Sequence, residues 1–201
     1  GGMAGQNRTS IDAAIWWEDG LYKTRLTFVE WKYTEKALGD CGGHNSRGND
    51  QRYRCETLEV RNIQPARDCY LESRRSNRTS RHYWAHLADA GISLRPLCGH
   101  TGCPFMGPFY QLMRQYLLAA YCQDELGDVE SVDVVVVGFQ GNEDLLRIPE
   151  ELAHLGHDVV SAWNRLLTRK APPLRHVPVE DLLSGVPSDG RREYIRERYG
   201  V

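Results

Sequence analysis

One apolar run in the second half of the sequence determines the kind of sheet that this chain can build. Residues 132–138 (Val-Asp-Val-Val-Val-Val-Gly) are apolar at both alternating sets of positions, apart from Asp133. Because strand side chains alternate between two faces, such a run is typical of a strand buried in the centre of a sheet. The segment before it begins at Pro108, carries apolar side chains at helical spacing and ends at Gly127. A helix followed by a buried strand predicts a mixed α/β fold.

Two further segments near the N-terminus read as a β-hairpin. Residues 10–17 and 26–33 are rich in β-branched and aromatic side chains, and Glu18-Asp19-Gly20 supplies turn residues between them. The remaining patterns predict a helix from Thr79 or Ser80 to Ala90, a helix over 157–168, a strand over 174–179 and a charged helix over 188–199. At 201 residues and 41% hydrophobic content, we expect residues 1–201 to form a single domain.

Two charged residues interrupt the second strand of this hairpin. Glu30 and Lys32 are two positions apart, so both side chains point to the same face of the sheet as Phe28. Charged side chains on such a face must be paired or face a cleft. Hairpin pairing also brings Asp12 beside Glu30. Two carboxylates and a lysine form a hard-oxygen site suited to Mg²⁺ and to the hydrolysis of phosphate esters, and the alternative is an ordinary cross-strand ion pair.

These residues carry a resemblance to a known superfamily. Asp12 on a hairpin, followed by Glu30-Trp31-Lys32-Tyr33-Thr34-Glu35, resembles the PD-(D/E)XK nucleases, and within them a family of bacterial proteins described as restriction endonucleases. The run Gln111-Leu112-Met113-Arg114 is similar to a Gln-Leu-x-Arg signature of that family. The resemblance implies a restriction-endonuclease-like mixed β-sheet flanked by helices. Because only eleven residues precede Asp12, we expect the N-terminal helix and first strand of that fold to be missing or replaced.

The resemblance implies a role for each matching position. Asp12 and Glu30 would bind Mg²⁺ or Mn²⁺, with the backbone carbonyl of Trp31 as a third protein oxygen. Lys32 would be the catalytic lysine that assists the attacking water. Gln111 would contact the lysine, the water or the scissile phosphate. Glu35 would support the metal ligands or act as an additional acid, and Arg114 would be a phosphate or carboxylate partner. The implied activity is metal-dependent hydrolysis of DNA phosphodiester bonds by an endonuclease.

An arginine-rich stretch supplies a candidate surface for DNA. The chain has a net charge of −2, but residues 52–82 hold eight arginines against four acidic residues, and the segment at about 37–107 reads as an insertion or a mobile part of the domain. A local cluster of arginines can face a phosphate backbone. We therefore expect DNA as the partner, held by Arg74, Arg75, Arg78 and Arg81. A solvated arm with no such role is the alternative.

The six cysteines admit a second kind of metal site. Cys98, His100 and Cys103 lie close together in the sequence and could seed a zinc site that Cys41, His44, Cys69 or Cys122 completes. Since no second Cys-x-x-Cys half-site exists, free structural cysteines are the favoured interpretation. Two alternative functions follow, namely an inactive nucleic-acid-binding module of the same fold and a zinc-stabilised interaction domain.

The sequence also gives expectations about the compartment and the oligomeric state of the protein. No apolar run reaches transmembrane length and no secretory apolar segment precedes the cysteines, so we expect a bacterial cytoplasmic protein with reduced thiols and no membrane contact. Superfamily members that cut duplexes often act as dimers, which makes a homodimer the expected assembly.

Overall fold

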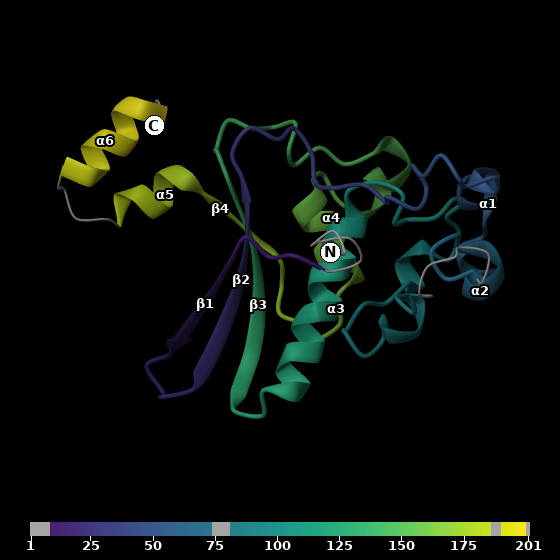
Figure 1. Ribbon diagram of the computed structural model, residues 1–201, viewed down its shortest axis with the longest axis horizontal. Helices are drawn as coiled ribbons and strands as arrows, with labels where there is room; N and C mark the ends of the chain where they lie inside the picture. The colour runs from purple at the N-terminus through teal and green to yellow at the C-terminus, as the bar shows by residue number, and fades with distance from the viewer. Residues whose placement is uncertain (1–8, 74–80, 186–189, 200–201) are drawn as a thin grey trace, which may run out of the picture.

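A four-stranded sheet forms the centre of the computed structural model, which describes residues 9–73, 81–185 and 190–199 (Figure 1). Its strands follow the order β1-β2-β3-β4. Strand β1 pairs with β2 antiparallel, whereas β3 runs parallel to β2 and β4 runs parallel to β3. The bounds are Ala13–Glu18 for β1, Thr24–Lys32 for β2, Val129–Gly138 for β3 and Arg175–Pro178 for β4. The prediction that the apolar run forms an interior strand is confirmed.

The predicted hairpin is also present, with its turn at residues 19–23. The turn is closed by Asp19, whose Oδ1 accepts hydrogen bonds from the backbone N–H groups of Leu21 and Lys23 at 2.8 and 3.1 Å. Tyr22 takes a left-handed backbone conformation with φ of 60°. The register places Ala13 opposite Val29, so that one further step brings Asp12 opposite Glu30.

Two helices cover one face of this sheet (Figure 1). Helix α3 (Phe109–Glu125) matches the predicted helix, and α4 (Val159–Leu166) lies within the predicted range 157–168. Asp158 begins α4 through a capping box with Ser161. Trp163 of α4 is fully buried and packs edge-on against Phe109 of α3, with ring centroids 5.2 Å apart. The core therefore lies between α3, α4 and the sheet.

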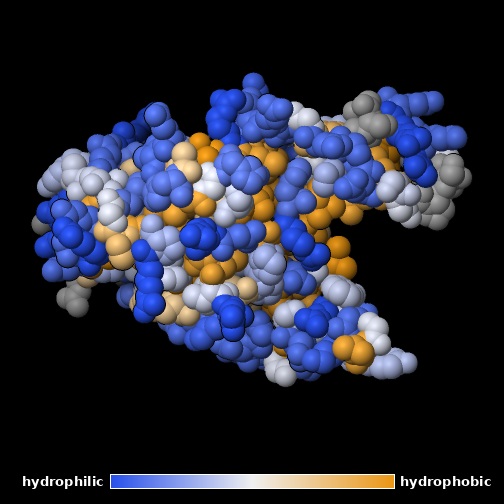
Figure 2. Space-filling model, turned by 180° about the vertical axis from the view of Figure 1, so that it is seen from behind, coloured by the Kyte–Doolittle hydropathy of each residue, from blue (hydrophilic) through white to orange (hydrophobic). Residues whose placement is uncertain are grey.

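The opposite face is covered at one end only. Val179, at the start of α5 (Val179–Ser184), packs with Val29, Val135 and Val137 of β2 and β3. The charged helix α6 (Gly190–Tyr199) follows, within the predicted range, of which Ser188 lies outside the described residues. Figure 2 shows apolar atoms in the hollow between the hairpin and α6. Every residue of β1 is exposed.

The segment 37–107 joins β2 to α3 through one-turn elements and loops. Its elements are α1 (Arg52–Thr57), α2 (Pro65–Asp68) and 3₁₀ turns at Val60–Asn62, Trp84–His86 and Arg95–Leu97; a further 3₁₀ stretch, Glu150–Leu155, follows β3. The prediction of a helix up to Ala90 is wrong within the described residues, where only the turn Trp84–His86 forms. The chain turns after these residues, where Gly91 adopts a left-handed φ of 70°.

Candidate active site

Glu30 and Lys32 form a buried ion pair at the C-terminal end of β2. Lys32 Nζ lies 2.8 Å from Glu30 Oε1, and the two residues are only 8% and 5% exposed. Their alternation with Val29 and Trp31 directs them toward the helix-covered face, as predicted from their spacing. Because removing two charges from water costs several kcal/mol per ion, the pair needs further polar partners.

One such partner is Gln115, which the sequence analysis did not select. Its Nε2 donates a hydrogen bond to Glu30 Oε2 at 2.6 Å, and the residue is 1% exposed. Its Oε1 is buried and makes no hydrogen bond. Gln115 thus holds the second carboxylate oxygen of Glu30 while Lys32 holds the first. A sequence signal existed, since Gln115 lies between Leu112 and Ala119 on the buried side of an amphipathic helix.

Asp12 lies just before β1 and meets β2 at the expected place. Its Oδ2 accepts a hydrogen bond from the backbone N–H of Trp31 at 2.8 Å, and its side chain is exposed. In a strand, the N–H and C=O of one residue point to the same neighbour. The Trp31 carbonyl is therefore directed to the side of the strand where Asp12 lies, which is the arrangement that a shared ion would need.

Glu35 closes the loop that follows β2. Its Oε2 accepts hydrogen bonds from the backbone N–H groups of Tyr33 at 2.9 Å and Thr34 at 3.1 Å, and its Oε1 lies 3.9 Å from Lys32 Nζ. Hydrogen bonding from its own N–H, then from Thr34, together with the charge of Lys32, lowers the pKa of Glu35 below its ordinary value of 4.5. Glu35 is therefore a carboxylate at neutral pH, placed beside the buried pair.

Gln111 and Arg114 each contact another part of the chain, and their expected roles toward a substrate stay predictions. Gln111 Oε1 accepts a hydrogen bond from the Gly39 N–H at 2.6 Å, which ties the loop after β2 to α3. The guanidinium of Arg114 stacks over the ring of Tyr110, 5.5 Å from its centroid. The glutamine that contacts the carboxylate of the Glu30–Lys32 ion pair is therefore Gln115, one helical turn after Gln111.

A glycine permits the close packing around Lys32. Gly138 is paired with Lys32 in the sheet, and a Cβ atom there would lie 2.8 Å from Leu145 Cδ2 and 3.3 Å from His176 Nε2. His176, which received no role from the sequence, stands opposite Val136 on β4, and Val136 stands opposite Glu30. Burial lowers the pKa of His176, which favours the neutral ring.

The donors at this strand end fit a hard divalent ion. The carboxylates of Asp12 and Glu30 and the Trp31 carbonyl are all oxygen donors, and Mg²⁺ is commonly bound by one or two carboxylates with water and substrate phosphate completing its shell. Within residues 9–73, 81–185 and 190–199, no three His, Cys, Asp or Glu side chains form a group that could hold an ion by itself. The protein would thus supply part of the shell.

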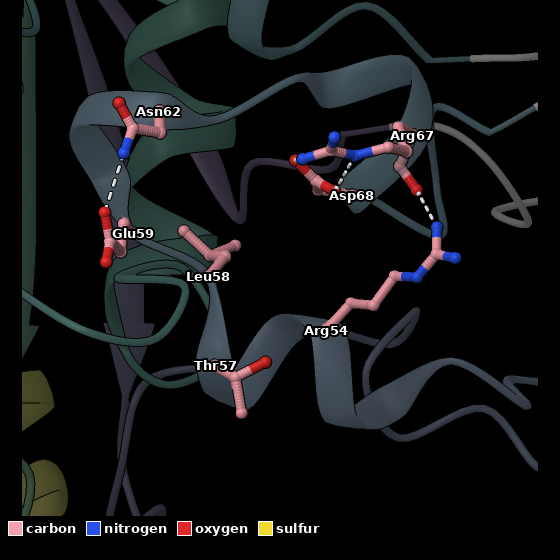
Figure 3. A pocket seen from close by; sticks show the side chains of 7 residues that line it. All are labelled: Arg54, Thr57, Leu58, Glu59, Asn62, Arg67 and Asp68. Carbon is pink, nitrogen blue, oxygen red and sulfur yellow. Dashed lines mark hydrogen bonds and ion pairs between the residues drawn. The ribbon is translucent and has the colours of Figure 1, made fainter.

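The arginines of the segment 52–82 mostly bind within the chain. Figure 3 shows Arg54 and Arg67 at the rim of a pocket of about 550 Å³, with Arg54 donating to the Arg67 carbonyl at 2.8 Å and Arg67 paired with Asp68 at 2.6 Å. Arg81 donates to the hydroxyl of Tyr83 at 2.7 Å. Arg74, Arg75 and Arg78 lie outside the described residues, so their expected contact with DNA stays a prediction.

Among the described residues, those of the alternative zinc site form no group that could hold a metal ion. Cys98 is exposed, and the ring of His100 stacks on His154 with centroids 6.4 Å apart. Cys103 is turned into a different cavity, which Cys98 and His100 do not line. All six cysteines are free thiols.

The mixed sheet, flanked by helices and carrying an acidic pair with a lysine at a strand end, is an α/β architecture consistent with restriction endonucleases. The model of one protein family, described as restriction endonucleases associating with ARP, matches residues 2–200. The chain belongs to this family, which makes it a nuclease-like protein. No curated protein and no solved structure matches the chain. None of the described helices is long and apolar enough to cross a membrane.

Proposed function

We propose that this chain is a metal-dependent endonuclease of the PD-(D/E)XK type that hydrolyses DNA phosphodiester bonds. The observation that carries the proposal is the burial of Glu30 and Lys32 as an ion pair beside Asp12. A buried pair contributes little net stability compared with apolar side chains of the same size. Its presence at a strand end, with an amide dedicated to it, favours a catalytic use. Membership of a restriction endonuclease family supports the same class of reaction.

The proposed chemistry assigns one task to each group. Asp12, Glu30 and the Trp31 carbonyl would hold Mg²⁺ or Mn²⁺. Such an ion, when bound, acidifies water and offsets charge on the phosphate. Lys32 would donate hydrogen bonds to the attacking water and to the phosphate oxygen that gains charge. As the water oxygen bonds to phosphorus, the water would lose a proton to bulk solvent, and the departing oxygen would take one up from solvent as its bond to phosphorus breaks. Gln115 orients Glu30 from behind.

Three further side chains are assigned supporting tasks. Glu35 supplies an additional carboxylate near Lys32, at 3.9 Å from its Nζ. Gln111 fixes the loop at Gly39, and its assigned task is a contact to the lysine, the water or the scissile phosphate. Arg114, on the same helix, is assigned to a phosphate.

The test is cleavage of supercoiled plasmid with Mg²⁺, Mn²⁺ or EDTA. We expect nicking that needs the metal and disappears in Glu30→Gln, a variant that keeps the size of the side chain. The matched control is Glu130→Gln, which removes an exposed carboxylate paired with Lys23 at 2.6 Å on the neighbouring strand. Full activity in Glu30→Gln, or cleavage in EDTA, would overturn the mechanism.

An inactive nucleic-acid-binding module is the second candidate. It is favoured by one observation, namely that both carboxylate oxygens of Glu30 are already engaged, by Lys32 and by Gln115. This candidate predicts DNA binding that falls with salt and is the same with and without Mg²⁺. Metal-dependent cleavage would exclude it.

The proposal includes the cellular setting. DNA is the partner, a homodimer is the form that cuts both strands, and the bacterial cytoplasm is the compartment. The six free thiols support a reducing compartment. Sedimentation of the protein with and without a DNA duplex tests the assembly, and a monomer in both conditions would contradict the homodimer.

A further inference from the structure

An aromatic pocket opens on the face of the sheet opposite the ion pair, at the same end of β2. Trp31, Tyr33 and Phe139 line it, together with aliphatic side chains of α5 and with Ile195 of α6. Its volume of about 310 Å³ is that of a small-ligand site. The lining side chains that the structure describes are all apolar or aromatic, and none carries a charge. The pocket thus lies between β2 and α6, where Figure 2 shows apolar atoms in a hollow.

The alternation of side chains along β2 connects this pocket to the candidate active site. Glu30 and Lys32 point to the helix-covered face, so Trp31 between them points to the other face, where its ring lines the pocket. The backbone carbonyl of the same tryptophan is the proposed third metal ligand, on the side of the strand where Asp12 lies. Since consecutive Cα atoms are about 3.8 Å apart, a phosphate at the metal site and a base in the pocket can belong to neighbouring nucleotides.

The aromatic rings of the pocket are held in place for contact with a flat ligand. Tyr33 and Phe139 pack edge to face, with ring centroids 5.0 Å apart and an angle of 63° between the ring planes. Phe139 also packs on the cluster of buried valines that β2, β3 and α5 share. Trp31 is 42% exposed, although the residues on either side of it in β2 are buried. A large exposed ring on a strand in the interior of a sheet is a rigid platform on which a base can stack.

Basic side chains of α6 border the pocket. The sequence of this helix has four arginines against two glutamates. Arg192 and Arg198 lie three residues before and after Ile195, which places them on the side of α6 that carries this pocket residue. The acidic Glu180 of α5 accepts the Gln140 N–H at 3.2 Å in the loop after β3. An aromatic pocket bordered by arginines matches a nucleic acid, whose bases stack and whose phosphates are negative, better than it matches an apolar protein segment.

We propose that this pocket holds an unpaired base of a single-stranded stretch of DNA beside the scissile phosphate. The inference rests on the proposed nuclease function and narrows its substrate class to DNA with unpaired bases. Inside a duplex both faces of a base are covered by its neighbours, so only a base outside the stack presents a face to Trp31. Because every base has such a face, the pocket selects unpaired structure and not sequence. The contact is stacking, and it therefore needs no metal ion.

The experiment measures binding of the full chain to DNA in EDTA, where metal-dependent cleavage does not occur. The probes are a thymidine oligonucleotide of about ten residues, an abasic strand of the same length and a duplex. The abasic strand keeps the phosphates and lacks the bases, so it should bind at least about 5-fold and up to about 150-fold more weakly, the usual loss for one stacked base.

Three variants assign this difference to the pocket. Trp31→Leu keeps an apolar side chain without a ring and should lose most of the difference between the thymidine and abasic strands. Trp31→Phe restores a ring and should keep it. The matched control is Trp16→Leu, because Trp16 is 52% exposed and pairs with Leu26 on the other face of the sheet. An unchanged difference in Trp31→Leu would overturn the assignment.

The wild-type protein alone separates failure of the pocket from failure of the proposed function. Equal binding of the thymidine and abasic strands would overturn the pocket and leave DNA as the partner. Binding of none of the three probes would overturn both. Base-dependent binding by a protein that cuts no plasmid with Mg²⁺ or Mn²⁺ would support the pocket and contradict the proposed chemistry.

A second measurement does not depend on the folding of variants. Irradiation of the wild-type protein with an oligonucleotide that carries iodouracil should crosslink Trp31, Tyr33 or Phe139, as read by mass spectrometry. Crosslinks confined to residues outside the pocket would contradict the assignment. A dimer that becomes a monomer in Trp31→Leu would show that the pocket is an interface between copies of the chain, which would also overturn it.

Discussion

The ion pair of Glu30 and Lys32 makes removal of one partner more damaging than removal of both. Lys32→Met leaves the Glu30 carboxylate buried with only Gln115 as a partner, and breaking a buried pair in this way costs about 3–5 kcal/mol. In the double variant Glu30→Gln/Lys32→Met no buried charge is left, so most of this loss should be recovered. Urea unfolding of the two single variants and the double variant measures the coupling. A double variant no more stable than Lys32→Met would contradict the interpretation.

Gln115 offers a milder change at the same site. Gln115→Leu removes the donor to Glu30 Oε2 without adding charge, and loss of a group that orients a metal ligand typically lowers metal affinity or activity about 10–100-fold. We expect cleavage to need more Mg²⁺ while the fold is kept. Gln123→Leu is the control on the same helix, because Gln123 donates to the Glu130 carbonyl away from the site. An equal effect of both substitutions would assign Gln115 a structural role only.

The sequence is enough to predict the positions of Asp12, Glu30 and Lys32, but not the contact between Gln115 and Glu30. The period of a strand is enough to place Glu30 and Lys32 on one face, and hairpin pairing is enough to bring Asp12 to the same end. The bond between Gln115 and Glu30 joins positions 85 residues apart, so it depends on how α3 packs over the sheet. Local periodicity places Gln115 on the buried side of the helix but does not say which strand residue it meets, and Gln111 is selected by the Gln-Leu-x-Arg resemblance alone.

Among the elements, the short helix α2 is stabilised by the side chain of Asp68, and this contribution to stability should depend on pH. Asp68 Oδ2 accepts the Gln64 N–H at 2.9 Å at the start of α2, and Asp68 pairs with Arg67. The Arg67 side chain, aided by that N–H, lowers the pKa of Asp68 below its ordinary value of 3.8. The stability from Asp68 is therefore complete above about pH 4 and is lost as the pH falls through the lower folded pKa. Urea midpoints of Asp68→Asn and wild type should converge on going from about pH 7 to about pH 3.

Glu72, after α2, should behave in the opposite sense. Burial raises its pKa above the ordinary value of 4.5, although its Oε1 accepts the Trp84 N–H at 2.8 Å. Its contribution is complete below pH 4.5 and is lost as the pH rises through the higher folded pKa. Glu72→Gln should therefore gain stability relative to wild type between about pH 3 and about pH 7. The same slope for Asp68→Asn and Glu72→Gln would refute these assignments.

Element lengths explain which parts of the fold were predictable. The 17 residues of α3 and the ten of β3 repeat their pattern often enough to be recognised. In the described part of the segment 37–107, residues 37–73 and 81–107, no element exceeds six residues, and a helix this short is not stable by itself. Its turns form because the surrounding core holds them, so the pattern predicts a helix up to Ala90 whereas residues 81–90 contain one 3₁₀ turn, Trp84–His86.

At the scale of the whole molecule, a single core joins the segment 37–107 to the sheet. One cluster of buried side chains contains Leu58 and Leu97 of that segment together with Phe28 of β2, Leu112 of α3 and Trp163 of α4. Since one apolar cluster spans both regions, we predict that they unfold together in a single cooperative transition. Leu97 is fully buried, so Leu97→Ala should cost about 2–5 kcal/mol.

Hydrogen exchange read by mass spectrometry near the urea midpoint tests this cooperativity. Peptides from residues 52–73 and from 109–125 should open with the same free energy, and Leu97→Ala should lower both by the same amount, because the lost contact belongs to a core that both regions share. Tyr121→Ala, an exposed site on α3, is the control and should change neither. If residues 52–73 open at lower urea than α3, the segment is a separate folding unit, and the prediction of one cooperative core is wrong.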